Sequence, residues 1–203
     1  MINSGSVSYK FQDLEKRLND IRIHFNIDTL KGDSGEFLSW DLLDELQKDC
    51  VRAYVALCHA EIESHFEYWA TNIINRALNI WKEKNKITLP LLSLCIHFKF
   101  IDSNSDTNEK IHQVVSLFKS SVIRENNGIK GANILKLFKP LGVDEASIMS
   151  ISPALDSFGV KRGEAVHTSI KVQQPLDIPT LISEVHYIQH SIKEFEELLD
   201  TLI

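Results

Sequence analysis

Arg162 and His167 lie five positions apart in a short segment, residues 156–168, that also contains Lys161 and Glu164. A histidine has an ordinary pKa near 6.5 and therefore exchanges protons at cellular pH. An arginine keeps its charge and can donate two parallel hydrogen bonds to phosphate oxygens. Together the two suffice for RNA cleavage without a metal. The histidine helps to deprotonate a ribose 2′-hydroxyl or to protonate the leaving 5′-oxygen, and the arginine stabilises charge on the pentavalent phosphorus.

The spacing of this pair is a weak signal when it is taken alone. Such pairs are common by chance, and the alternative is a surface arginine with a histidine that caps a helix. Positions five apart on an ideal helix point about 140° away from each other. The pair therefore converges more easily if a helix ends near Gly163, or if two subunits contribute to one site.

The distribution of charge strengthens the case for this segment. The chain has a net charge of −6, which argues against generic nucleic-acid binding. Residues 110–171, however, carry nine Lys/Arg against five Asp/Glu, whereas the regions on both sides are acidic. A basic third in an acidic protein is typical of a local phosphate-facing surface, and a chance arrangement of solvated faces is the alternative.

Composition predicts an ordinary globular protein. Apolar residues make up 43% and charged residues 25% of the 203, and only 8 Gly and 5 Pro are present, which argues against a many-turned all-β fold. No stretch is long and apolar enough for a membrane helix, and the first residues lack the pattern of a signal peptide. Cys50, Cys58 and Cys95 show no disulfide pattern. We therefore expect a cytoplasmic protein.

Apolar residues recur at helical spacing along most of the chain. The pattern predicts a single all-α domain over residues 1–203, with an N-terminal helix and loop extension over 1–40 and a core over 41–203. Two long helices are expected at about 45–84 and 180–202. The second has a heptad seam, in which apolar residues step by four and three from Leu181 to Leu202, suited to packing along another long helix.

Shorter helices are expected between the two long ones, at about 91–100, 107–123, 134–138 and 144–151. Residues 91–100 are also compatible with a buried strand. Ser152-Pro153 predicts the start of a further helix, with the hydroxyl as N-cap and proline in the first turn. That helix leads to Arg162.

Two pairs of side chains, each containing a histidine, resemble partial metal sites. His59 and Glu63 lie one helical turn apart, and so do His186 and His190. Neither pair has a matching set of ligands at a recognisable spacing, so a structural or solvated role is favoured. We expect neither a metal nor a cofactor.

Three segments carry a family resemblance: Val55–Glu67, Asn127–Asp144 and Leu155–Thr168. An all-helical domain with Arg-x(4)-His just before its last long helix resembles the HEPN superfamily of ribonucleases. These segments are similar to the clade called RiboL-PSP-HEPN, and the resemblance covers most of residues 45–202.

The resemblance implies a HEPN-like helical bundle and a metal-independent endoribonuclease that acts as a homodimer on RNA. Such enzymes serve in defence or toxin–antitoxin systems, so an antitoxin or another defence-system protein is a possible partner. Arg162 and His167 would be the catalytic pair. Residues with auxiliary roles would be Glu164, Lys161, Thr168 and Glu63, with Glu67 as an alternative to Glu63 for orienting Arg162.

One position departs from the superfamily pattern, because Gly163 stands where a polar residue often follows the arginine. Two other hypotheses stay open beside the nuclease, since some members of the superfamily are non-enzymatic. The chain is a catalytically inactive HEPN module that binds RNA or a protein partner, or it is a helical scaffold that dimerises through its C-terminal seam.

Overall fold

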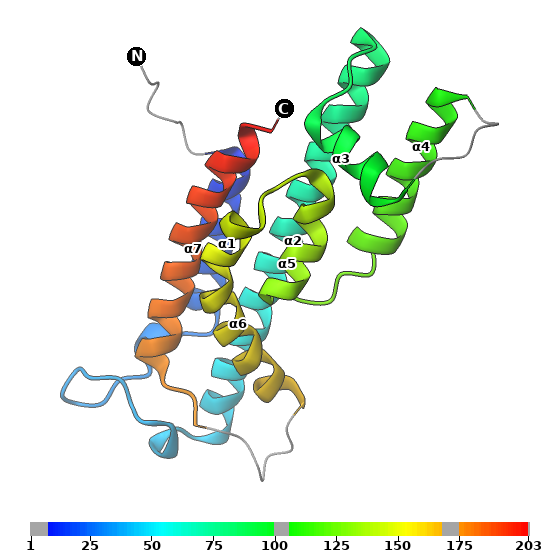
Figure 1. The fold of residues 1–203 in the computed structure, drawn as a ribbon. Coiled ribbons are helices and arrows are strands. Elements are labelled where there is room, and N and C mark those ends of the chain that lie inside the picture. The colour runs from blue at the N-terminus through cyan, green and yellow to red at the C-terminus, as the bar shows by residue number, and fades with distance from the viewer. Residues whose placement is uncertain (1–7, 100–105, 168–174, 203) are drawn as a thin grey trace, which may run out of the picture.

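The computed structural model describes residues 8–99, 106–167 and 175–202, and of His167 only the backbone. Over these residues the chain forms α-helices without any strand element, joined by short 3₁₀ turns and a π-helical segment at Lys119–Ile123 (Figure 1). The helices are α1 (Tyr9–His24), α2 (Glu45–Lys84), α3 (Leu89–His97), α4 (Thr107–Phe118), α5 (Gly131–Phe138), α6 (Glu145–His167) and α7 (Ile178–Asp200). The predicted all-α fold and its two long helices are confirmed.

Helix α2 is the longest element, with 40 residues. A capping box begins it: the Asp44 side chain accepts the backbone N–H of Gln47, and the Gln47 side chain accepts the N–H of Asp44. The chain leaves the helix at Asn85, which adopts a left-handed conformation. Buried residues recur along the whole of α2, so it is the element against which the other helices pack.

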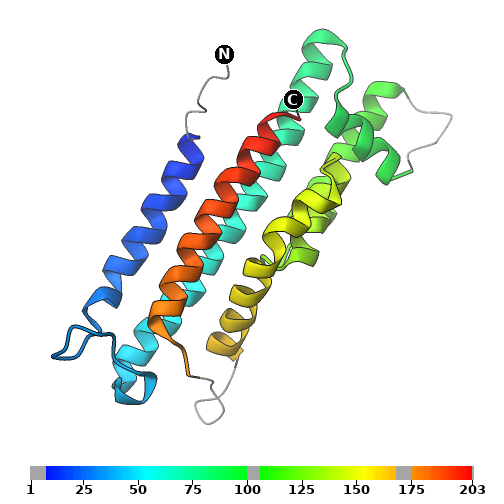
Figure 2. The ribbon, with the colours of Figure 1, turned by 60° about the vertical axis from the view of Figure 1, so that its left-hand side comes forward.

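Helices α1, α2 and α7 run side by side, and α6 lies next to α7 (Figure 2). Three aromatic rings from different helices meet in the core: Phe66 of α2, Phe138 of α5 and Phe195 of α7. Their centroids are 5.1–6.2 Å apart in edge-to-face arrangements. These contacts hold the short α5, and the loop before it, against the two long helices.

The apolar face of α1 is buried in the same core, through Phe11, Leu14, Leu18 and Ile21. A buried polar cluster also joins α1 to the bundle. Glu196 of α7 accepts hydrogen bonds from Trp69 Nε1 at 2.8 Å and Ser8 Oγ at 2.5 Å, and its Oε1 lies 2.6 Å from Nε2 of His65. The proposed division of the domain at residue 41 stays a prediction.

The heptad seam of α7 is buried within its own chain. Leu181, Val185, Ile188, Ile192, Phe195 and Leu199 are each at most 4% exposed. These side chains are already covered by neighbouring helices, so this seam does not offer a dimer surface. The hypothesis of a helical scaffold that dimerises through this seam is therefore not supported.

The prediction that a new helix starts at Ser152-Pro153 is wrong. Helix α6 runs without a break from Glu145 to His167, with Pro153 inside it. The buried side chains Ile148, Ile151, Leu155 and Phe158 continue in phase across the proline. Burial of this stripe outweighs the lost hydrogen bond of the proline, and Ser152 Oγ donates to the Ile148 carbonyl at 2.9 Å instead of capping a new helix. The helix also does not end near Gly163.

Within the described ranges, every helix falls short of the length and apolarity that a membrane span requires. Cys50, Cys58 and Cys95 are free thiols.

Candidate active site

A cavity of about 360 Å³ lies between α2, the loop before α5, and α6. Arg162 and Gly159 line it from α6, and His59 and Glu63 line it from α2. The remaining wall consists of Asn127, Gly128 and Lys130 from the loop before α5, and of Asn133 from α5 itself. The cavity therefore brings together parts of all three segments that carry the family resemblance.

Hydrogen bonds to α2 fix the first half of this loop. The Glu63 carboxylate accepts the backbone N–H of Gly128. The Asn126 side chain donates to Glu67 Oε1 at 3.0 Å and to the Gly128 carbonyl at 3.3 Å. Gly128 has φ +123°, a conformation open mainly to glycine, and a Cβ there would lie 3.1 Å from Asn133 Nδ2. Glycine is thus required for the loop to turn here under the Asn133 side chain.

Contacts with α6 fix the second half of the loop. The backbone N–H of Gly131 donates to Asp156 Oδ1 at 2.8 Å. A Cβ on Gly131 would lie 2.5 Å from Ser152 Oγ and 2.6 Å from Ser152 Cβ. The N-terminus of α5 therefore approaches α6 as closely as only glycine allows, which sets where Lys130 meets α6.

His59 is 5% exposed and faces this cavity. Burial, together with the positive charge of Arg162, lowers the pKa of His59 from its ordinary value to about 4. Its Nδ1 lies 3.7 Å from Glu63 Oε2. At neutral pH the imidazole is uncharged, so the ring contributes hydrogen-bonding atoms to the cavity without adding positive charge.

Glu63 responds to the same surroundings in the opposite direction. Burial raises the pKa of Glu63, the Gly128 N–H opposes this shift, and the negative charge of Glu67 adds to it. The positive charge of Arg162 also stabilises the carboxylate form of Glu63. Arg162 thus interacts electrostatically with both α2 residues, and the cavity couples the three side chains.

The comparison with protein families decides the family of this chain. The model of the RiboL-PSP-HEPN family matches residues 12–203. The chain belongs to the RiboL-PSP-HEPN family. The predicted resemblance is confirmed, and searches of curated proteins and of solved structures find no match.

In this HEPN chain, α6 separates the two residues of the Arg-x(4)-His pair. Arg162 lies at the cavity. Position 167 is the last residue of the same continuous helix, about 140° further round its axis. It is seven positions from the exposed Val160 and one turn after Gly163, which also lines the cavity, so the backbone at 167 lies between the cavity side and the solvent-facing side of α6. The side chain of His167 lies outside the described residues.

The auxiliary candidates of the HEPN hypothesis lie in different places. Glu63 lines the cavity with Arg162. Lys161 forms an ion pair with Glu184 of α7, which also accepts a hydrogen bond from Ser157 Oγ at 3.0 Å, so Lys161 is directed to the α6–α7 interface. Glu164 is partly buried near the end of α6, and Thr168 lies outside the described residues.

Sequence reasoning missed several lining residues of the HEPN cavity. His59 was considered only as a partial metal ligand, and Lys130 and Asn133 were given no role. The described residues contain no group of three or more His, Cys, Asp or Glu arranged to hold a metal. The available signal is the spacing of Gly128 and Gly131, which is typical of a turn but does not identify the element against which that turn packs.

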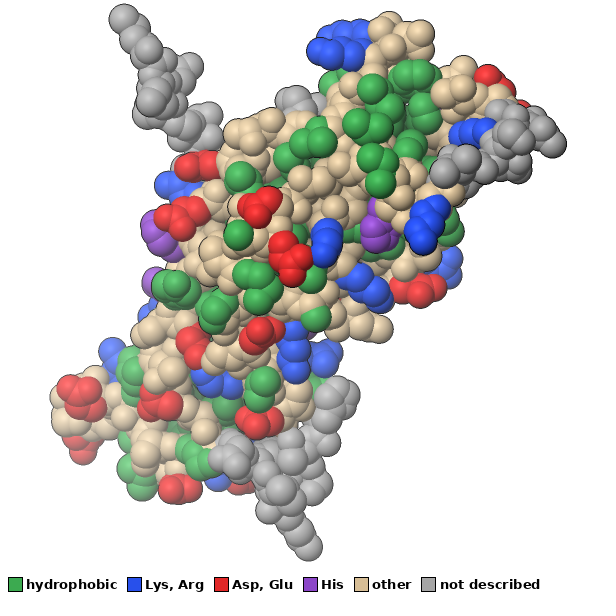
Figure 3. All heavy atoms as spheres, viewed as in Figure 1, with side chains coloured by type: hydrophobic (Ala, Val, Ile, Leu, Met, Phe, Trp, Pro, Cys, Tyr) green, Lys and Arg blue, Asp and Glu red, His purple; other side chains and the backbone are tan. Residues whose placement is uncertain are grey.

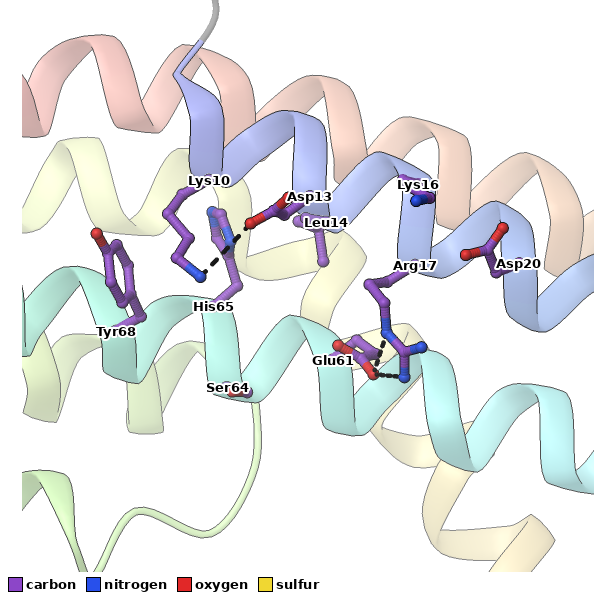
Figure 4. Close-up of a pocket in the computed structure, with 10 residues that line it drawn as sticks. All are labelled: Lys10, Asp13, Leu14, Lys16, Arg17, Asp20, Glu61, Ser64, His65 and Tyr68. Atoms are coloured by element: carbon purple, nitrogen blue, oxygen red, sulfur yellow. Dashed lines mark hydrogen bonds and ion pairs between the residues drawn. The ribbon is translucent and has the colours of Figure 1, made fainter.

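A second and larger cavity, of about 550 Å³, lies between α1 and α2 (Figure 4). Two of the cations that line it are paired with carboxylates. Arg17 Nη2 lies 2.7 Å from Glu61 Oε1, and Lys10 Nζ lies 3.6 Å from Asp13 Oδ2. Since Lys10 and Arg17 are paired with carboxylates and Asp20 also lines this groove, its charge is mixed, which does not favour a phosphate ligand.

On the face of the molecule in Figure 3, basic and acidic side chains are interspersed, and no continuous basic surface covers it. A phosphate ligand that meets this face would therefore be recognised by a local cluster of donors, not by a broad positive field.

Proposed function

We propose that this HEPN protein is a metal-independent endoribonuclease in a defence or toxin–antitoxin context, with Arg162 and His167 as its catalytic pair. The observation that carries the proposal is the cavity in which Arg162 faces His59 and Glu63, in a chain whose family is associated with nucleases. Its substrate would be RNA, because the reaction needs a 2′-hydroxyl beside the scissile phosphate.

The proposed reaction is a transesterification. The ribose 2′-oxygen attacks the adjacent phosphorus, a bond to phosphorus forms, and the bond to the 5′-oxygen of the next nucleotide breaks. His167 accepts the 2′-hydroxyl proton or donates a proton to the leaving 5′-oxygen. Arg162 stabilises the negative charge on the phosphoryl oxygens with a two-pronged set of donors. The products are a 2′,3′-cyclic phosphate and a 5′-hydroxyl.

A homodimer with a composite site is part of this proposal. On one continuous helix the positions of Arg162 and His167 point about 140° apart, so one phosphate meets both more easily if two subunits contribute. Val160 is 48% exposed and lies on the same side of α6 as position 167. That side would be covered when a second subunit docks.

Among the auxiliary residues, Glu63 has the best-supported role. It holds the Gly128 loop and interacts with Arg162, so it acts as a positioning residue. Glu164 and Thr168 flank the catalytic pair in sequence and remain candidates for contacts with substrate or with the partner subunit. Lys161 would act through the α6–α7 interface, by way of Glu184.

The second candidate function is an inactive HEPN module that binds RNA or a protein partner. One geometric observation on the single chain favours it, because positions 162 and 167 point about 140° apart on α6. A chain that stays monomeric would keep the cavity but lack a complete catalytic pair.

The test measures RNA cleavage by purified protein in the presence of EDTA. Arg162→Ala and His167→Ala should each lower the rate at least about 100-fold. Arg76→Ala and His190→Ala are matched controls, because Arg76 forms an exposed ion pair with Asp200 and the His190 side chain is 69% exposed. In cells, expression of the wild type should slow growth, and both catalytic variants should relieve this effect.

A mixing experiment tests the composite site. Arg162→Ala and His167→Ala proteins, each inactive alone, should regain partial activity when their subunits exchange, because one mixed dimer keeps one intact Arg162 and one intact His167. Intact RNA with the wild type under several buffer conditions would contradict the nuclease proposal. A strict monomer by sedimentation at micromolar concentration would contradict the composite site.

A further inference from the structure

Lys130 is placed beside Arg162 by contacts from two sides. It is the residue just before α5, whose N-terminus is held against α6 by the hydrogen bond from Gly131 to Asp156. A Cβ on Gly159 would lie 3.0 Å from Cγ and 3.3 Å from Cε of Lys130. The aliphatic part of Lys130 therefore lies across α6 at Gly159, one turn before Arg162.

This arrangement puts two cations on one side of α6. Gly159 and Arg162 are three positions apart and so share a helix face. The side chains of Lys130 and Arg162 therefore lie at the same cavity, and both residues line it. Within residues 8–99, 106–167 and 175–202, no carboxylate forms an ion pair with Lys130, whereas Lys161 is neutralised by Glu184.

The rest of the loop is held in place by the protein itself. The Gly128 N–H goes to Glu63, the Gly131 N–H goes to Asp156, and Asn133 Nδ2 donates to the Asn127 carbonyl at 3.0 Å. Among the loop residues that line the cavity, Lys130 is the one with a charged side chain. A flexible ammonium with three donors is suited to a single phosphate as a point charge.

We propose that Lys130, held against Gly159, binds a backbone phosphate of single-stranded RNA adjacent to the phosphate that Arg162 contacts. The subsite is a binding element, not a catalytic one, and it rests on the proposed RNA substrate. It explains why α6 has a glycine at position 159, inside a helix where glycine costs stability: any larger residue would push the lysine stem away.

Equilibrium binding of a labelled single-stranded RNA of mixed sequence tests the subsite. All proteins carry His167→Ala, so that cleavage does not interfere. Lys130→Gln should weaken binding about 5-fold or more at low salt. It should also reduce the slope of log affinity against log salt by about 0.7, the contribution of one phosphate on a single strand. Lys130→Arg should keep the slope.

Two further variants separate position from charge. Lys136→Gln is the matched control, because Lys136 is an exposed lysine of α5 that does not line the cavity; it should change the slope by much less. Gly159→Ala leaves the net charge unchanged but displaces the Lys130 stem, and we expect it to weaken binding at least about 2-fold. Thermal melts check that each variant is folded.

The subsite is overturned if Lys130→Gln binds with the affinity and slope of Lys136→Gln, or if the His167→Ala protein binds no RNA. Its failure is distinguishable from failure of the nuclease proposal. In proteins that retain His167, equal rates of RNA cleavage by the wild type and by Lys130→Gln would contradict the subsite and support the nuclease proposal. If neither the wild type nor any variant cleaves RNA but RNA binding still depends on Lys130, the nuclease proposal is contradicted and the subsite is supported.

Discussion

The carboxylate of Glu63 accepts the backbone N–H of Gly128, and this bond ties the middle of α2 to the loop that precedes α5. The two residues are 65 positions apart in the sequence. The positive charge of Arg162 also favours the carboxylate form of Glu63, so the side chain that holds the loop also responds to the arginine of the cavity. The position of the loop and the charge balance of the cavity therefore both depend on the Glu63 carboxylate.

Replacing Glu63 tests this coupling. Glu63→Ala leaves the Gly128 N–H without its acceptor and should lower the free energy of unfolding by about 1–3 kcal/mol. Glu63→Gln keeps an acceptor oxygen and removes the charge, so it should cost less stability. Both should reduce RNA cleavage, and chemical denaturation with activity assays measures the two effects. Equal stability losses in the two variants would contradict a role for the Gly128 hydrogen bond.

The close approach of α5 to α6 makes Gly131 intolerant of a side chain. In Gly131→Ala the new Cβ would lie 2.5 Å from Ser152 Oγ, and we expect a loss of about 1–3 kcal/mol in unfolding free energy. Gly163→Ala is the matched control. A Cβ there meets no atom within 4 Å, so the gain in helix propensity should stabilise the protein by about 0.5–1 kcal/mol. Opposite signs for the two Gly→Ala changes in thermal melts are the expected result, and two losses of similar size would count against it.

The sequence predicts the helices well because their signal is local. Apolar spacing located the two long helices α2 and α7 to within a few residues. Asp144, the first residue of the helix expected at 144–151, accepts the N–H groups of Ala146 and Ser147 at the start of α6. Pro153 misled the prediction. The cost of a proline inside a helix is a local property, whereas the burial of the stripe on both sides of it depends on tertiary contacts.

The candidate site was predicted less completely than the fold. Arg162 and Glu63 were named from the sequence, and both line the cavity. His59 and Lys130 received no part in the site, because their role follows from contacts between segments that are distant in the sequence. Patterns of spacing identify the face of a helix that is buried, but they do not identify which loop covers that face.

Glu196 should be the most sensitive polar position outside the site. It is 5% exposed and meets His65, Trp69 and Ser8 from two other parts of the bundle. Glu196→Ala leaves these donors unpaired in the core, and we expect a loss of about 3 kcal/mol in unfolding free energy. Glu194→Ala, on the exposed side of the same helix, should change stability by less than about 0.5 kcal/mol. Urea denaturation of both variants gives the comparison, and similar midpoints would rule out a structural role for the cluster.

Acid should destabilise the protein through His59. The pKa of His59 is about 4 in the folded protein and near 6.5 in an unfolded chain, so the unfolded state binds the proton first as the pH falls. Above about pH 6.5 the group has no effect. Between 6.5 and 4 it lowers the free energy of unfolding by up to about 1.4 kcal/mol per pH unit. His59→Gln should show a shallower decline over that window, and an unchanged decline would contradict the assignment. Comparing the two proteins removes contributions of other groups, including the raised pKa of Glu63.

Titration of His59 by NMR separates the two causes of its low pKa. Burial is the larger cause and the charge of Arg162 the smaller one. In Arg162→Gln the pKa of His59 should therefore rise, but it should remain below 6.5 because the ring is still buried. Arg76→Gln, which removes an arginine on the same helix as His59 that pairs with Asp200, should leave the pKa unchanged. If the pKa of His59 is the same in the wild type and in Arg162→Gln, the guanidinium does not face the imidazole across the cavity.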